Sequence, residues 1–138
     1  MIKSILLYGA ETWRLTEKNK KKVEATEMDA IRTSLRVLRL DRIRNEDLRE
    51  RMGMKGTIVD EIENRQLTWY GHVRRMPDER LPKQVWDWVP KERRKKGRPR
   101  KSWMEGVRKA MSARNLTDQQ WGNRDEWKLG TGQRRCMF

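Results

Sequence analysis

The chain has 138 residues, of which 34 are Lys or Arg and 20 are Asp or Glu, so its formal net charge is +14. The single cysteine excludes a disulfide within the chain, and no stretch approaches the roughly 18 consecutive apolar residues that a membrane span needs. The apolar start, residues 1–8, is too short for a secretory signal. We therefore expect an intracellular protein, nuclear or cytoplasmic, with no membrane partner. Because charged residues make up 39% and hydrophobic residues 35%, we expect an all-α fold with several short-to-medium helices on a thin core and flexible termini.

The first long helix is predicted over residues 17–39. Thr16 is its candidate N-cap, because a threonine hydroxyl can accept a hydrogen bond from a free N–H group of the first turn. The apolar side chains that recur at helical spacing are Met28, Ile31, Leu35 and Leu38. Asn45 is the candidate cap of a second, short helix that ends at Gly53. The inward side chains of that helix are Leu48 and Met52.

A second long helix is predicted over residues 57–76, where Thr57 opens the helix and Pro77 ends it. Its apolar face consists of Ile58, Ile62, Trp69, Val73 and Met76. Pro82 fits the first turn of a short helix that ends at Pro90 and includes Val85, Trp86 and Val89. Trp88 lies on the other side of that helix, where it could stack on a base or cover another helix, and we prefer the second role.

Two helices are predicted in the last third of the chain. Ser102 starts the first, with Trp103, Val107 and Ala110 inward. Thr117 starts the second, because Thr117 and Gln120 have the spacing of a capping box. We predict core packing for the tryptophans at apolar helical positions, which are Trp69, Trp86, Trp103 and Trp121.

Charge divides the chain into three predicted parts: a helical segment over 1–90, a basic arm over 91–101 and a Trp-containing helical tail over 102–138. The arm contains eight basic residues and one acidic residue, so half of the net charge lies in it. Because like charges repel one another, we expect the arm to be extended and available for interaction.

Catalysis is not favoured by the residue types present. The only histidine is His72 and the only cysteine is Cys136, whereas a zinc site needs about four Cys, His or carboxylate ligands. The carboxylates Asp60, Glu61 and Glu63 fall on the polar side of a predicted helix beside an arginine, which favours a solvated face over a magnesium site. We therefore expect no enzyme activity, no catalytic or metal-binding residue, no cofactor and no small-molecule substrate.

The candidate nucleic-acid-binding residues are those of the basic arm. They are Lys91, Arg93, Arg94, Lys95, Lys96, Gly97, Arg98, Pro99, Arg100 and Lys101. Dense Lys and Arg neutralise phosphates and release counterions, on DNA or on RNA, without reading sequence. The central residues 97–100 resemble the core of an AT-hook, in which proline keeps the chain extended and arginines enter a narrow minor groove. The alternatives are a solvated tether and a nuclear-import signal.

Four segments, in order, resemble the region that follows the polymerase domain in non-LTR retrotransposon reverse transcriptases. Residues 6–13 (LLYGAETW) are similar to a stretch near the end of the polymerase region, and residues 65–76 resemble the pattern R-x-L-x-W-x-G-H-V-x-R-M. The basic residues 97–99 followed by Trp103 come next in the same order. Residues 123–128 resemble the terminal element D-R-x-x-W-R, with asparagine in place of the first aspartate.

The resemblance implies the thumb and tail of an RNA-directed DNA polymerase, which would help to hold template RNA and target DNA. The family's metal-binding aspartates, its endonuclease domain and the Cys/His knuckle of some relatives have no counterpart here, so no catalytic residue is carried over. The leading hypothesis is a non-catalytic nucleic-acid-binding module derived from a transposable element. The alternative is an inert or structural remnant, whose helices pack on a polymerase domain or another partner while the arm acts as a linker.

Overall fold

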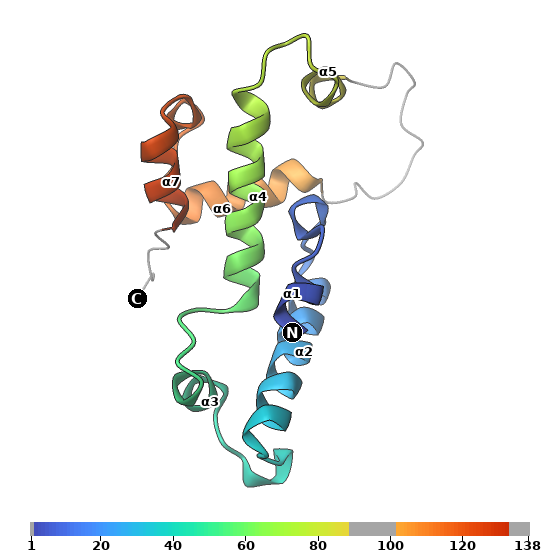
Figure 1. Ribbon diagram of the computed structural model, residues 1–138, viewed down its shortest axis with the longest axis vertical. Coiled ribbons are helices and arrows are strands. Elements are labelled where there is room, and N and C mark those ends of the chain that lie inside the picture. The colour runs from blue at the N-terminus through green and yellow to red at the C-terminus, as the bar shows by residue number, and fades with distance from the viewer. Residues whose placement is uncertain (1, 89–101, 133–138) are drawn as a thin grey trace. The chain divides into compact units, whose positions relative to one another are not determined.

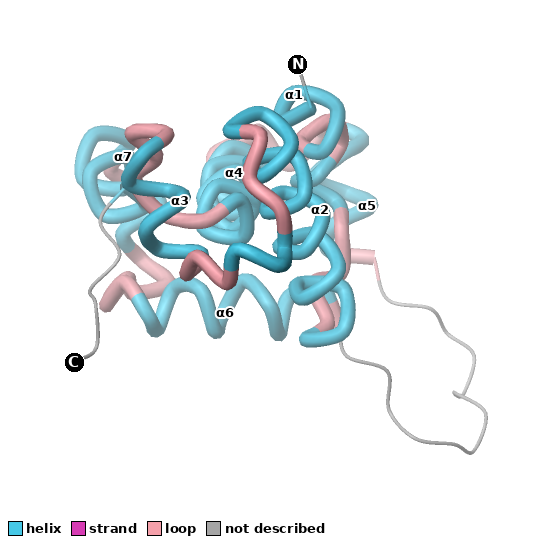
Figure 2. Tube along the Cα trace, turned by 90° about the horizontal axis from the view of Figure 1, so that it is seen from below, coloured by secondary structure: helices cyan, strands magenta, loops and turns pink. Residues whose placement is uncertain are grey.

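The computed structural model describes residues 2–88 and 102–132 (Figure 1). These residues form seven α-helices and three short 3-10 helices with no strand (Figure 2), so the predicted all-α fold is confirmed. The α-helices are α1 Ile2–Leu6, α2 Glu17–Leu35, α3 Asn45–Arg51, α4 Ile58–Arg74, α5 Leu81–Asp87, α6 Trp103–Ala113 and α7 Arg124–Gly132. The 3-10 helices are η1 Ala10–Thr12, η2 Arg39–Asp41 and η3 Gln120–Gly122. The chain forms two compact units, unit 1 over residues 1–63 and unit 2 over residues 64–138, and the boundary falls inside α4.

Unit 1 has two groups of buried apolar side chains. The first group joins the start of the chain to the first turns of α4, through Leu7, Ala10, Leu15, Ile58, Val59 and Ile62. The second group joins α2 to α3, through Met28, Ile31 and Leu48. The helix α2 contacts both α1 and α3. The thin core that composition predicts is therefore divided between the two ends of α2.

The helix α2 begins as predicted and ends four residues earlier than predicted. The Thr16 Oγ1 atom accepts a hydrogen bond from the Asn19 N–H group at 3.2 Å, which confirms the N-cap. At the other end Arg36 is left-handed, with φ 54°, and the N–H group of Val37 donates to the Arg32 carbonyl at 3.0 Å. This Schellman motif reverses the chain. Leu38 is therefore outside the helix and exposed, and its predicted inward position is wrong.

The same motif ends α3 and α6. Gly53 is left-handed at φ 64° and Asn115 at φ 52°, and in each case the next N–H group bonds to a carbonyl five residues back, at Arg49 and Met111. The residue after each left-handed position is apolar and packs against a buried group. These residues are Val37, Met54 and Leu116.

The prediction for α3 is right at its end and wrong at its start. Gly53 ends the helix as expected, and Leu48 is fully buried. Asn45 is the first residue of the helix and does not cap it, because its Oδ1 atom accepts a hydrogen bond from Arg32 Nη2 at 2.8 Å. Met52 is exposed, and Met54 packs against the core instead.

The helix α4 starts with a capping box. The Thr57 N–H group donates to Asp60 Oδ2 at 2.9 Å, and the Asp60 N–H group donates to Thr57 Oγ1 at 3.2 Å. The helix ends at Arg74, two residues before the predicted end. The predicted face is buried at Ile58, Ile62 and Val73 and only partly buried at Trp69 and Met76. Three further buried apolar side chains of this helix were not predicted, and they are Val59, Leu67 and Tyr70.

Unit 2 has an aromatic core that includes both the last half of α4 and the C-terminal helices. Its buried apolar side chains are Leu67, Tyr70, Val107, Ala110, Met111 and Trp127. Trp86, Trp103 and Trp121 pack against this group, which agrees with their predicted role, and the rings of Trp86 and Trp103 meet edge to face at 5.1 Å. Trp69 is half-buried and lies beside His72 instead.

The short elements of unit 2 agree with the prediction at Ser102 and differ from it at two other places. Ser102 caps α6 as predicted, since its hydroxyl accepts a hydrogen bond from the Glu105 N–H group at 3.1 Å. The last helix begins at Arg124 and not at Thr117, because η3 intervenes and Asn123 Oδ1 accepts from the Asp125 N–H group at 3.1 Å. Trp88 is 67% exposed. Among the described residues it therefore does not cover another helix, which was the role we preferred for it.

Candidate nucleic-acid interface

The predicted binding residues, Lys91 to Lys101, lie outside the described residues, as does Cys136. The described surface nevertheless contains cationic groups of its own, and their geometry decides which of them are available to a phosphate.

Two arginines of unit 2 contact one tryptophan and a third lies near enough to act on them, and we call Arg74, Arg75 and Arg124 the Trp121 arginine cluster. The last turn of α4 supplies Arg74, whose Cζ atom lies 5.0 Å from the centroid of the Trp121 ring. Arg75 follows it and donates from Nη1 to the Trp121 carbonyl at 2.6 Å. Arg124 begins α7. Trp121 thus holds two neighbouring guanidinium groups by its ring and its backbone.

The cluster is electrostatically uncompensated. Burial lowers the pKa of the Arg75 guanidinium, and the like charge of Arg124 lowers that pKa further. Among the described residues none of the three arginines forms an ion pair, and the Arg74 Nε atom is buried without a hydrogen-bond partner. An arginine does not lose its proton in a protein. The cluster therefore keeps its charge and attracts anions.

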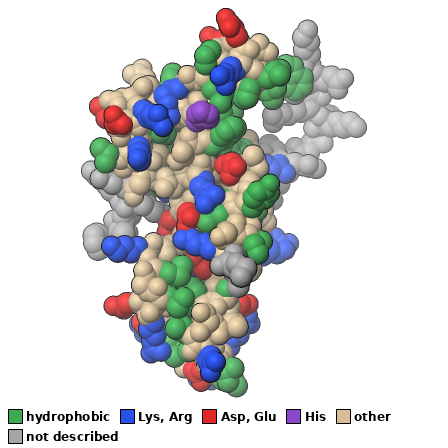
Figure 3. All heavy atoms as spheres, viewed as in Figure 1, with side chains coloured by type: hydrophobic (Ala, Val, Ile, Leu, Met, Phe, Trp, Pro, Cys, Tyr) green, Lys and Arg blue, Asp and Glu red, His purple; other side chains and the backbone are tan. Residues whose placement is uncertain are grey.

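The described acidic side chains near the cluster do not form ion pairs with its arginines. Asp118 Oδ1 accepts a hydrogen bond from the Tyr70 hydroxyl at 3.4 Å, and burial followed by the Asp118 charge raises the pKa of Tyr70. Asp125 and Glu126 lie in the first turn of α7, where the helix dipole stabilises negative charge. His72 is exposed on α4 three residues before Arg75. Figure 3 shows this histidine in purple, beside blue basic side chains over α4 and α7.

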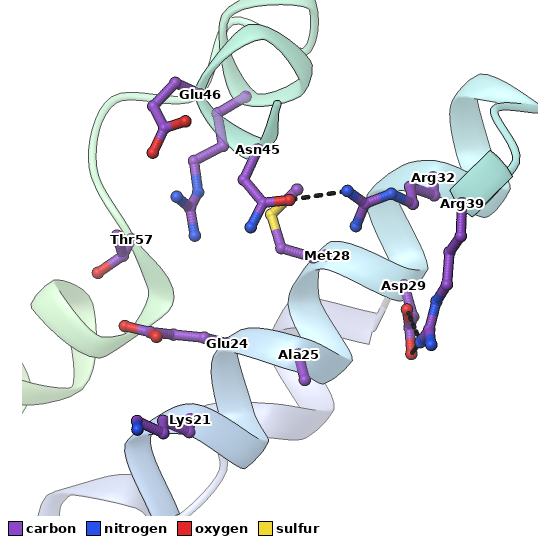
Figure 4. A pocket seen from close by; sticks show the side chains of 11 residues that line it. Lys21, Glu24, Ala25, Met28, Asp29, Arg32, Arg39, Asn45, Glu46 and Thr57 are labelled. Atoms are coloured by element: carbon purple, nitrogen blue, oxygen red, sulfur yellow. Dashed lines mark hydrogen bonds and ion pairs between the residues drawn. The ribbon is translucent and has the colours of Figure 1, made fainter. Parts of the chain in front are cut away.

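A charged groove of about 690 Å³ lies between α2 and α3 in unit 1 (Figure 4). Three of the four basic side chains that line it have partners in the fold. Arg39 Nη2 lies 2.6 Å from Asp29 Oδ1, and Arg49 Nη2 lies 3.1 Å from the buried Glu27 Oε2. Because four basic and three acidic side chains line it, the groove is nearly neutral and does not form a cationic surface.

The three carboxylates considered for a metal site have structural roles. Asp60 caps α4, Glu61 lies 2.5 Å from the Lys3 ammonium group, and Glu63 lies 2.8 Å from that of Lys20. Glu63 is buried, so the predicted solvated face is wrong at this residue. Within the described part of the chain, no three His, Cys, Asp or Glu residues come together in a way that could hold a metal ion.

Sequence reasoning missed the Trp121 arginine cluster, although its members lie in two of the segments that show the family resemblance. Arg74 and Arg75 belong to residues 65–76 and Arg124 to residues 123–128. The signal that could have found them is the basic pair at the end of a predicted helix. Their proximity to residues 121–124 depends on how α7 packs in unit 2, and no local pattern shows it.

No family model, no curated protein and no solved structure matches the chain. In the described ranges, no helix has both the length and the apolar content required to cross a membrane.

Proposed function

We propose that this chain is a non-catalytic nucleic-acid-binding module that resembles the C-terminal, post-polymerase part of a non-LTR retrotransposon reverse transcriptase. The observation that supports it best is the Trp121 arginine cluster, in which guanidinium groups gather without a paired carboxylate. Phosphates of DNA or RNA are anions that such groups bind well, because the planar guanidinium can bond two oxygens at once. The basic arm, 91–101, adds a second and denser set of cations.

A contact inside unit 2 supports the resemblance. Residues 65–76 and 123–128, which resemble two separate family patterns, meet in one core. Gly71 packs directly against the Trp127 indole, whose Nε1 donates to the Leu67 carbonyl at 3.0 Å. A glycine and a tryptophan at these two positions are thus required by the same contact.

The second candidate function is a structural remnant that packs on a polymerase domain or another partner. The observation that favours it is on α5 and the residue after it, where Leu81 is 73% exposed and Val85 and Trp88 are each 67% exposed. Leu81 and Val85 are four residues apart in α5 and share one helical face, and Trp88 directly follows the helix with extended backbone. An exposed apolar face of this kind is typical of a surface that contacts a partner.

The first test neutralises the arm. Changing Arg93, Arg94, Lys95 and Lys96 to Gln in the full chain should weaken binding to duplex DNA, since each lost phosphate contact removes counterion release. If about four contacts are lost, the slope of log affinity against log salt should become shallower by roughly 3.6. The measurement is a fluorescence-anisotropy titration at several salt concentrations. Unchanged binding would remove the arm from the mechanism and leave the Trp121 arginine cluster as the candidate surface, whereas no binding by the wild type would leave the structural remnant as the leading function.

The second test concerns the Trp121 arginine cluster. Arg124→Gln removes an exposed cation and should make the same slope shallower by roughly 0.9 if Arg124 contacts one phosphate. The matched control is Arg51→Gln, which removes an exposed charge at the end of α3. We expect no change in slope from the control. Equal slopes for the wild type and Arg124→Gln would show that the cluster does not bind the backbone.

A further inference from the structure

A second described feature combines cations with an aromatic ring, at the start of α2 in unit 1. A groove of about 450 Å³, here called the Trp13 groove, is lined by Trp13, Arg14, Leu15, Asn19, Lys22 and Val23. This volume lies within the range of roughly 300–1,000 Å³ that is typical of small-ligand sites. The groove shares no residue with the basic arm or with the Trp121 arginine cluster.

The local fold explains the shape of this groove. After η1 the backbone is extended at Trp13, with φ −71° and ψ 141°, and the Thr16 N–H group donates to the Arg14 carbonyl at 3.1 Å before Thr16 caps α2. Leu15 is buried in the core beneath, and Trp13 and Val23 pack against the same group. The Asn19 Nδ2 atom donates to the Arg14 carbonyl at 3.3 Å, which ties the extended segment to the helix. The apolar floor is therefore rigidly positioned.

The charges of the groove have one sign. Arg14 and Lys22 are exposed, and no carboxylate is among the lining residues. Neither cation forms an ion pair with another described residue. Lys20, two residues before Lys22 on the helix, is different, because its ammonium group is held 2.8 Å from Glu63 Oε1. Lys20 is therefore engaged in an ion pair within unit 1, whereas Arg14 and Lys22 lie in the groove with Trp13.

We propose that the Trp13 groove binds an unpaired nucleotide of single-stranded nucleic acid, with the base on the indole of Trp13 and the phosphates at Arg14 and Lys22. A positively charged groove with an aromatic platform is the usual arrangement for single strands, since every base has a face that can stack. The indole is half-buried in the groove floor, so a base that is stacked inside a duplex does not reach it. The inference rests on the proposed function and assigns single strands to this groove.

The test uses the full chain, a ten-nucleotide oligo(U), a ten-nucleotide oligo(dT) and a ten-base-pair duplex. The variant Trp13→Leu keeps an apolar side chain against the core and removes the stacking face. We expect it to weaken binding to oligo(U) and oligo(dT) by about fivefold or more and to leave duplex affinity unchanged. The relative loss on the two single strands shows whether RNA or DNA is preferred.

A charge-matched pair of variants keeps the proposal falsifiable if Trp13→Leu does not fold. Arg14→Gln with Lys22→Gln removes the two exposed cations of the groove, whereas Lys18→Gln with Lys21→Gln removes two lysines of the same helix that do not line it. We expect a larger loss of single-strand affinity from the first pair. In the wild type, photo-crosslinking of 5-iodouracil oligonucleotides should mark Trp13, as read by mass spectrometry.

Two negative results have different meanings. If the wild type binds single strands and the two charge pairs lose affinity equally, or if the crosslink falls elsewhere, the groove assignment is wrong and the proposed function stands. If the wild type binds neither single strands nor duplex at low salt, the proposed function itself fails, and this inference fails with it.

Discussion

Gly71→Ala is expected to lower the free energy of unfolding by roughly 1–3 kcal/mol, because it overpacks a filled core. A Cβ atom at residue 71 would overlap Trp127 Nε1 and lie 2.7 Å from Trp127 Cδ1. The indole cannot move away easily, since it is 2% exposed and its Nε1 donates to the Leu67 carbonyl. Alanine normally stabilises a helix relative to glycine. The expected change in the free energy of unfolding therefore has the opposite sign to the change that helix propensity alone predicts. Denaturant unfolding followed by circular dichroism measures the change.

Gly106→Ala is the matched control for this prediction. Gly106 lies inside α6, and a Cβ atom there would meet nothing within 4 Å. Its replacement should therefore raise the free energy of unfolding by up to about 1 kcal/mol. In a Trp127→Ala background, which by itself should cost about 3–5 kcal/mol, Gly71→Ala should lose most of its penalty. If the two glycine substitutions change stability in the same direction, the Gly71–Trp127 contact is not the one described.

Glu27→Ala is expected to destabilise unit 1 by about 3–5 kcal/mol, because it leaves a buried arginine without its counter-charge. Glu27 Oε2 lies 3.1 Å from Arg49 Nη2, and the two side chains are only 6% and 16% exposed. The pair joins α2 to α3. Amide hydrogen exchange should show the loss of protection in these two helices, and denaturant unfolding should give its size.

An exposed ion pair between α2 and η2 provides the comparison that separates the effect of burial from that of charge. Asp29 and Arg39 are closer, at 2.6 Å, but their side chains are 51% and 76% exposed. Water screens such a pair, so Asp29→Ala should destabilise much less than Glu27→Ala. Replacing Glu27 and Arg49 together by Met should recover most of the loss, since an apolar pair needs no counter-charge. Equal losses at the two pairs, or a double variant as unstable as Glu27→Ala, would contradict this account.

The sequence by itself determined the helical class and the places where several helices begin. Thr16, Thr57 and Ser102 cap their helices as predicted, because a cap needs only a side chain and an N–H group within one turn. Gly53 ends α3 for an equally local reason, its left-handed φ of 64°. The basic arm is also read from the sequence alone, since its density of charge is independent of any fold.

Only the tertiary structure decided which side chains are buried and which cations are available. The apolar repeat that reached Leu38 could not show that Arg36 would turn left-handed and that Val37 would enter the core in its place. The burial of Glu63 depends on Lys20, far away in the chain. The Trp121 arginine cluster and the Gly71–Trp127 contact likewise join segments about fifty residues apart. Local spacing fixes the faces of a helix, whereas the partner of each face is set by packing between distant segments, which has no local signal.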